Sequence, residues 1–254
     1  MRSSATNLAD IQRQFPRSAA YDIEWVMENH MGPNVLWLTE AVCQVMKLKP
    51  GMRLLDLGCG KALSSIFLAK EFGVQVWATD LWIGASENWQ RICAAGMQDR
   101  VFPIHAEARS LPYADEFFDA IISMDAYHYF GTDDLYLGNY LSRLLKPGGQ
   151  IGIAVPGLTT ELEGGIPAEL KPYWDWDFCS FHSPPWWRRR WENTPQIKVE
   201  LADSIPAGWQ HWLAWLELCR ENGAPTSEGE AELVRLDSGR RLGFTRLVGR
   251  KAAN

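Results

Sequence analysis

The chain has 254 residues, of which 46% are hydrophobic and 22% are charged, values close to the averages for globular proteins. This composition excludes a mainly disordered, collagen-like or low-complexity protein, and the length favours one elaborated core over two large domains. The formal net charge of −6 provides no long-range attraction for a phosphate backbone. We therefore expect no nucleic-acid partner.

The five cysteines are widely spaced, odd in number and free of any CxxC pair. This pattern disfavours a disulfide framework and a zinc cluster, so we expect no metal and a reducing compartment. The first twenty residues contain no signal-like apolar segment, and no run approaches about 18 apolar residues. These observations predict a cytoplasmic protein without membrane insertion.

The predicted elements begin with a helical region. Tyr21 to Asn29 reads as one helix, and a second is expected from Pro33, because proline early in a helix costs no hydrogen bond. From Leu54 to Val155, short apolar runs alternate with helix-like segments, which predicts βα units around a mainly parallel sheet. The expected strands are Arg53 to Leu57, Val74 to Thr79, Val101 to His105, Ala120 to Met124 and Gln150 to Val155. The expected helices are Leu63 to Phe72, Ala85 to Ala95 and Asp133 to Leu145, the last ended by Lys146-Pro-Gly-Gly149.

Tryptophan is concentrated after the fifth strand, with eight of the 13 residues between Trp174 and Trp215. Pro156 to Pro195 predicts an insertion of short helices and loops, which we interpret as a cap over the core. A strand from Ile197 to Leu201, a helix from Ala207 to Asn222, a polar linker and a strand from Leu242 to Gly249 would complete seven strands. The predicted regions are an N-terminal helical lid (1–50), a ligand-binding core (51–156), a cap (157–196) and a C-terminal completion of the core (197–254).

A glycine-rich turn follows the first predicted strand in Arg53-Leu-Leu-Asp-Leu-Gly-Cys-Gly-Lys-Ala62. Glycines at a sharp strand-to-helix turn let the backbone approach a ligand and accept positive φ angles. The dinucleotide fingerprint GxGxxG requires a third glycine at position 63, where the chain has Leu63. The spacing therefore disfavours an NAD-dependent redox enzyme.

This turn resembles the first motif of the class I S-adenosylmethionine-dependent methyltransferases, acidic-x-Gly-x-Gly-x-Gly. The chain reads Asp56-Leu-Gly58-Cys-Gly60-Lys-Ala62, with alanine in place of the third glycine. Asp80 closes the next predicted strand, 20 residues after Gly60. Three further features follow in the family's order: Ala106-Glu107-Ala108 with Leu111-Pro-Tyr113, then Phe117-Phe-Asp-Ala120, then Arg143-Leu-Leu-Lys-Pro-Gly-Gly149. The resemblance is close from Arg53 to Val155 and loose elsewhere.

The resemblance implies a Rossmann-like α/β fold, a seven-stranded mostly parallel sheet with helices on both faces, and S-adenosylmethionine as cofactor. It implies that Asp80 binds the ribose and that Glu107, where most members have aspartate, meets the adenine amino group. The expected cofactor-binding residues are Asp56, Gly58, Cys59, Gly60, Asp80, Leu81, Ala106, Glu107 and Met124. They follow strand ends on one rim, where open α/β sheets bind ligands.

The acceptor side is expected after the fourth strand, in Ser123-Met-Asp-Ala-Tyr-His-Tyr129. His128 is the preferred general base, because histidine can accept a proton near pH 7; a pocket-lining role without proton transfer is the alternative. Tyr21, on a helix that covers the donor in related enzymes, is the second catalytic candidate. The substrate-binding candidates are Trp25, Asp125, Tyr129, His182 and Trp186, although Trp25 and most cap tryptophans would serve equally well as packing residues.

These features predict a methyltransferase that acts on a nitrogen or oxygen of a small-molecule acceptor by in-line displacement, with nitrogen preferred for the aromatic density and acidic balance. One alternative is carbon methylation or cyclopropane formation on a lipid or quinone-like acceptor. An alternative of another class is a sensor that binds S-adenosylmethionine without turnover. The sequence is also compatible with a homodimer.

Overall fold

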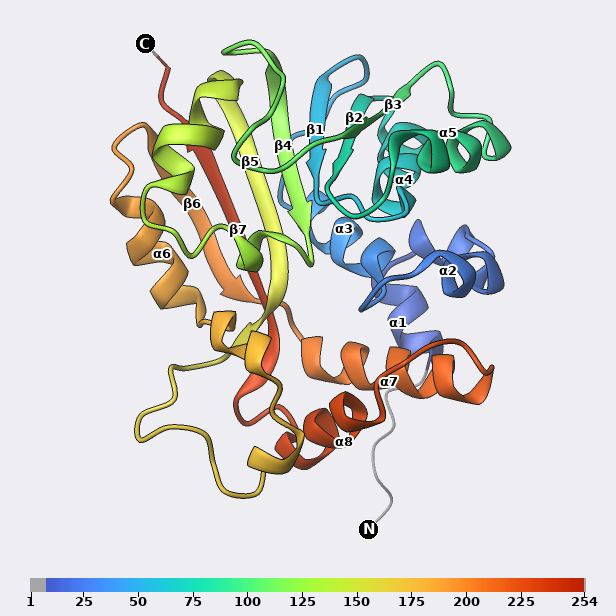
Figure 1. The fold of residues 1–254 in the computed structure, drawn as a ribbon, viewed down its shortest axis with the longest axis vertical. Helices are drawn as coiled ribbons and strands as arrows, with labels where there is room; N and C mark the ends of the chain where they lie inside the picture. Colours follow the sequence, from blue (N-terminus) through green and yellow to red (C-terminus); the bar gives the residue numbers. More distant parts are fainter. Residues whose placement is uncertain (1–7, 254) are drawn as a thin grey trace.

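Seven strands form one sheet in the computed structural model, which describes residues 8–253 (Figure 1). The first seven positions of the predicted N-terminal region lie outside the described residues. The strands are β1 (Arg53–Leu57), β2 (Gln75–Asp80), β3 (Val101–His105), β4 (Phe118–Met124), β5 (Leu145–Leu158), β6 (Ile197–Ser204) and β7 (Leu242–Lys251). Their order is β3-β2-β1-β4-β5-β7-β6. β7 runs antiparallel to β5 and β6, and the other pairs are parallel, which confirms the predicted seven-stranded, mostly parallel sheet.

Helices cover both faces of this sheet. They are α1 (Leu8–Gln14), α2 (Ile23–Asn29), α3 (Val35–Cys43), α4 (Leu63–Phe72), α5 (Ala85–Ala94), α6 (Pro184–Glu192), α7 (Gly208–Glu221) and α8 (Glu228–Asp237). Successive strand residues point to opposite faces, so Leu54 belongs to the core beneath α3 and α4, whereas Leu55 belongs to the core beneath α6. Figure 1 shows α7 and α8 beyond the carboxyl ends of the central strands.

The segment predicted as a helix from Asp133 to Leu145 is not a regular α-helix. It forms one π turn over Leu137–Leu141 followed by a 3-10 turn over Ser142–Leu144. Gly138 and Asn139 are poor helix formers, and the Ser142 hydroxyl donates to the carbonyl of Gly138 at 3.0 Å. The Lys146-Pro-Gly-Gly149 stretch belongs to the irregular start of β5 instead of lying between elements.

The prediction of a polar linker after Asn222 is wrong, because α8 occupies most of that segment. The Ser227 hydroxyl accepts a hydrogen bond from the backbone N–H of Glu230 at 3.2 Å, which caps the helix. Leu233 and Val234 are fully buried against the core. A helix with one apolar face therefore forms despite a polar composition.

The cap region contributes substantially to the core. Trp187 and Trp191 of α6 are fully buried and pack in the same cluster as Tyr127 and Leu247. The other regular pieces of the cap are the 3-10 turns Lys171–Tyr173 and Trp176–Ser180. The α6 tryptophans thus hold this segment to the sheet, and only the earlier part of the cap is free to border a ligand site.

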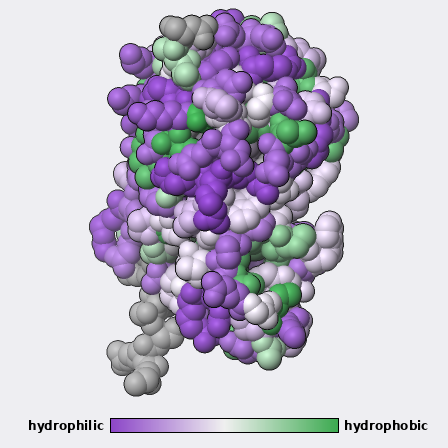
Figure 2. Space-filling model, turned by 90° about the vertical axis from the view of Figure 1, so that its left-hand side faces the viewer, coloured by the Kyte–Doolittle hydropathy of each residue, from purple (hydrophilic) through white to green (hydrophobic). Residues whose placement is uncertain are grey.

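The side of the molecule that carries α6 and β6 is mostly hydrophilic, with hydrophobic residues in small separate groups (Figure 2). Of the helices in residues 8–253, none combines the length and the apolar character needed to cross a bilayer.

Candidate active site

The turn after β1 is folded against the end of β2. The backbone N–H groups of Gly58 and Cys59 both donate to the carbonyl of Thr79, at 2.8 and 3.2 Å. Gly58 and Gly60 have φ angles of +75° and +53°. A Cβ on Gly58 would lie 2.3 Å from the Cβ of Ala126, so only glycine fits this turn without displacing the segment after β4.

Asp80 stands at the end of β2 and is held by three backbone donors. Its Oδ2 accepts from Gly60 N at 2.8 Å, and its Oδ1 accepts from Trp82 N and Ile83 N at 2.7 and 2.9 Å. The residue is 8% exposed and borders a cavity. Oδ1 uses both of its lone pairs and Oδ2 uses one, so Asp80 is oriented and Oδ2 can still accept a hydrogen bond from a ligand.

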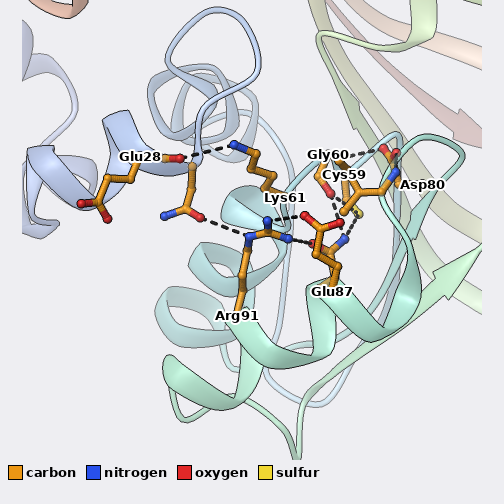
Figure 3. Close-up of polar contacts among 10 residues, drawn as sticks. Glu28, Cys59, Gly60, Lys61, Asp80, Glu87 and Arg91 are labelled. Atoms are coloured by element: carbon orange, nitrogen blue, oxygen red, sulfur yellow. Dashed lines mark hydrogen bonds and ion pairs between the residues drawn. The ribbon is translucent and has the colours of Figure 1, made fainter. Parts of the chain in front are cut away.

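Side chains of α5 support the glycine turn from below (Figure 3). Asn88, which is 1% exposed, donates to the carbonyl of Gly60 at 2.8 Å. Arg91 donates to Asn88 Oδ1 at 3.1 Å and to Asn29 Oδ1 at 3.2 Å, and so reaches the end of α2. Lys61 donates to the carbonyl of Glu28 at 3.3 Å. This network, which sequence reasoning missed, joins the N-terminal helices to the turn.

Asp56 lies beneath the turn, fully buried. Its Oδ2 accepts from the hydroxyls of Ser64 and Ser65, both at 2.6 Å, while its Oδ1 has no hydrogen-bond partner among the described residues. Burial raises the pKa of Asp56 to about 6 against the lowering effect of the two serines. The structure therefore places Asp56 as a support of the turn, outside the cavity wall.

The main cavity has a volume of about 270 Å³ and lies at the carboxyl ends of β1, β2 and β4. Of the predicted residues, it is lined by Gly58, Cys59, Gly60, Asp80, Leu81, Ala106, Glu107, Met124, Asp125 and Tyr129. It is also lined by residues that the sequence did not single out, among them Asn29, His30, Met31, Gly32, Trp82 and Arg109. Glu107 is held at its edge by Arg109, whose backbone N–H donates to it at 2.7 Å.

Asp125 follows β4 directly and has a left-handed backbone conformation, with φ of +53°. Its Oδ2 lies only 2.4 Å from the position that a Cβ on Gly32 would occupy. The carboxylate therefore rests against the loop between α2 and α3. Burial and then the charges of Glu230 and Asp177 raise the pKa of Asp125 well above its usual range. The nearby ring of Tyr129 lies 5.8 Å from that of Trp82. An acid and two aromatic rings thus share one end of the cavity.

His128 is 2% exposed and does not line the cavity. Its ring packs on those of Tyr129 and Phe181, at 4.0 and 5.8 Å, and its Nδ1 is buried without a hydrogen-bond partner in the described chain. Burial lowers the pKa of His128 to about 3. The side chain is therefore a weak base, and the geometry does not support the role predicted for it.

Tyr21 and Trp25 also lie away from the cavity wall. Their rings stack 6.0 Å apart on α2 and its approach, as their spacing predicts. The Tyr21 hydroxyl donates to Glu71 at 3.0 Å, and burial followed by the charge of Glu71 raises its pKa. These contacts are those of a packing pair that fastens the N-terminal region to α4.

The two cap residues predicted to bind substrate contact each other instead. The His182 and Trp186 rings stack 3.6 Å apart and nearly parallel, and His182 Nδ1 lies 3.0 Å from Glu161. The guanidinium carbon of Arg190 also lies over the Trp186 ring, 4.1 Å from its centroid. Neither residue lines the cavity, so the prediction that they reach the ligand has no support in this geometry.

The sheet order, the glycine turn and the cavity at the strand ends define an α/β protein that binds a nucleotide-like ligand at a topological switch point. A family model described as a methyltransferase domain matches residues 54–149. The demethylmenaquinone methyltransferase of Corynebacterium glutamicum is 30% identical over 179 residues, 70% of this chain and 68% of that protein. The chain belongs to the class I S-adenosylmethionine-dependent methyltransferases.

Other similarities are shorter or lower in identity. The methyltransferase GfsG of Streptomyces halstedii is 30% identical over 118 residues, which is 46% of this chain, and the match spans only 42% of that relative. The crystal structure of geranyl diphosphate C-methyltransferase from Streptomyces coelicolor has a TM-score of 0.72 and 16% identity, and covers 98% of this chain and 99% of that one. The structural likeness supports the fold that the resemblance implied.

Proposed function

We propose that the protein transfers a methyl group from S-adenosylmethionine to a nitrogen or oxygen atom of a small-molecule acceptor. The observation that carries the proposal is the placement of Asp80. Its carboxylate is fixed by three backbone donors at the rim of the cavity and faces the glycine turn. A buried acid that is oriented in this way, with one lone pair free on Oδ2, suits a ribose hydroxyl.

The remaining donor residues fit the same molecule. Gly58 and Gly60 leave no side chain between the turn and the cavity, so the methionine portion can approach the backbone. Glu107 lines the same cavity as Asp80 and would accept a hydrogen bond from the adenine amino group. Leu81, Ala106 and Met124 provide apolar walls.

When bound, S-adenosylmethionine supplies a methyl carbon on a cationic sulfur; an acceptor lone pair forms the new bond while the carbon–sulfur bond breaks and its electron pair stays on sulfur. The protein therefore has to hold the acceptor in line and take up its proton. Asp125 borders the cavity, whereas His128 is buried and does not line it. We assign proton uptake to Asp125 in place of His128.

The proposed cellular compartment and the second candidate reaction rest on separate observations. All five cysteines are free, which supports a reducing environment such as the cytoplasm. The similarity to a demethylmenaquinone methyltransferase over 70% of the chain favours carbon methylation of a quinone-like acceptor as the second candidate. A neutral quinone gives Asp125 no charged partner, and this difference separates the two candidates.

The test is incubation with methyl-labelled S-adenosylmethionine and a metabolite extract, followed by mass spectrometry of labelled products. We expect one labelled product together with stoichiometric S-adenosylhomocysteine. Asp80→Asn should weaken S-adenosylhomocysteine binding at least tenfold, because a charged acceptor is lost and its backbone donors to the turn are disturbed. The exposed Asp99→Asn is the matched control and should bind normally. Tight binding without any labelled product would support the sensor, and absence of binding would refute the proposal.

A further inference from the structure

Asp125 lines the cavity, and the charges of two carboxyl groups from distant parts of the chain act on it. Asp125 follows β4, Asp177 lies in the 3-10 turn Trp176–Ser180 of the cap, and Glu230 lies in the first turn of α8. After burial, the charges of Glu230 and Asp177 are the named causes that raise the pKa of Asp125. Asp177 and Glu230 do not line the cavity themselves, but their negative charges act on the carboxyl group that does.

No cation of the described chain forms an ion pair with these three groups. Asp177 Oδ1 is buried without a hydrogen-bond partner among residues 8–253. Glu230 has one neutral partner, the indole N–H of Trp212 at 2.5 Å. Carboxylates without a charged partner in a half-buried site are unfavourable, so such groups take up a proton or gain from a bound cation that displaces it.

Aromatic rings stand beside the carboxylates. Tyr129 and Trp82 both line the cavity and are 48% and 69% exposed, so their faces are available to a ligand. Tyr129 lines the same cavity as Asp125, and burial and the charges of Asp125, Asp177 and Glu230 raise the pKa of its phenol. An aromatic pair next to an acid is a suitable environment for an alkylated ammonium group.

We propose that the acceptor end of the cavity binds an organic cation, an amine in its ammonium form, with Asp125 as its direct partner and Tyr129 and Trp82 as its aromatic walls. The inference rests on the proposed function and names the substrate class of the same site. Asp177 and Glu230 complete the negative surroundings from the cap and α8. A metal ion does not fit, because no group of three or more His, Cys, Asp or Glu side chains in the described part of the chain is arranged to hold one.

The loop between α2 and α3 offers an independent way to disturb Asp125. Gly32 has no positive φ, so alanine is compatible with its backbone, and its carbonyl is fixed by the indole N–H of Trp215 at 2.9 Å. A Cβ at this position would meet only the carboxylate end of Asp125, which can move. Gly32→Ala should therefore fold normally and shift the carboxylate, without touching Asp80 or the glycine turn.

The experiment compares two probes of the same shape on protein saturated with S-adenosylhomocysteine, which carries no sulfonium charge. The probes are choline and its neutral isostere 3,3-dimethyl-1-butanol, measured by calorimetry and by ligand-observed NMR. We expect choline to bind about tenfold more tightly, and Asp125→Asn and Gly32→Ala to remove the difference. Asparagine tolerates the left-handed backbone at position 125, so this variant keeps the fold.

Glu230→Gln should reduce the choline preference severalfold, whereas Glu228→Gln, an exposed position in the same helical turn, should leave it unchanged. Equal affinity for the two probes, no binding of choline, or an unchanged preference in Asp125→Asn would overturn the inference. S-adenosylhomocysteine titrations of the same samples keep the two proposals apart. If S-adenosylhomocysteine binds normally and choline is not preferred, only the proposal of an amine acceptor is contradicted. If the unaltered protein does not bind S-adenosylhomocysteine, the proposed function itself is contradicted.

Discussion

At the scale of single residues, the glycine turn depends most sharply on Gly58. An alanine at this position would have an unfavourable φ of +75°, and its Cβ would lie 2.3 Å from the Cβ of Ala126. Both the backbone strain and the steric clash would distort the wall of the cavity. We expect Gly58→Ala to lose at least tenfold in S-adenosylhomocysteine affinity by calorimetry. Gly229→Ala, inside α8 with open space around it, is the control and should bind normally with equal or higher stability. Normal binding by Gly58→Ala would show that the turn does not contact the donor.

Asp56 provides a pH prediction at the same scale. Its folded-state pKa of about 6 exceeds its unfolded value of 3.8, so the fold favours the protonated form. The stabilisation is complete below pH 3.8 and is lost as the pH rises through 6, by about 3 kcal/mol in total. Unfolding in urea at pH 4.5 and 7.5 should therefore show Asp56→Asn gaining stability relative to the unaltered protein at the higher pH. Parallel pH profiles for the two proteins would contradict this assignment.

Residue-level prediction from sequence placed residues at the cavity where their position depends on local spacing. Gly58, Gly60 and Asp80 follow strand ends at fixed positions, so the parallel sheet brings them to one cavity. His128 and His182 were predicted to reach the ligand but do not line the cavity. The direction and burial of a side chain depend on the residues that pack against it. Phe181 packs on His128 and Trp186 stacks on His182, and neither contact has a signal in the spacing of the sequence.

At the scale of elements, α5 braces the glycine turn and the end of α2 through Asn88 and Arg91. Removing the Asn88 amide leaves the Gly60 carbonyl without this buried donor, at a cost of about 1 to 3 kcal/mol. We expect Asn88→Ala to weaken S-adenosylhomocysteine binding about tenfold. Glu87→Gln affects only the half-exposed ion pair with Arg91 and should change affinity less than twofold. Equal effects of the two substitutions would argue against a brace.

Elements were predicted well where hydrophobic periodicity was strong, as in β1, α4 and α7. The helix α8 was not predicted because charged residues dominate its sequence. Ser227 and Glu230 have the spacing of a helix cap, and this signal could have predicted it. Missing α8 also meant missing Glu230, whose charge acts on Asp125 at the proposed amine site. The Trp-rich cap was interpreted as a lid from composition alone, and composition does not distinguish the buried Trp187 from a ring that faces a ligand.

At the scale of the whole molecule, the two halves of the cavity are built from different regions. The donor half is lined by the turns after β1, β2 and β3, whereas the proposed amine site is lined by the end of β4, where the charges of Asp177 in the cap turn and Glu230 in α8 act on Asp125. Hydrogen exchange can separate them. S-adenosylhomocysteine at 100 times its dissociation constant stabilises the fold by about 2.7 kcal/mol, which slows exchange through global unfolding everywhere. The informative amides are therefore those that exchange by local opening.

Among these locally opening amides, S-adenosylhomocysteine alone should protect residues 58–61, 80–83 and 106–109 and leave the cap turn and the first turn of α8 unchanged. Adding choline should then protect residues 174–181 and 227–231, because the ammonium group draws Asp177 and Glu230 towards Asp125. In Asp125→Asn the first pattern should persist and the second should disappear. Protection of the cap by the nucleoside alone would mean that the cap closes over the donor, and the division of the cavity drawn here would fail.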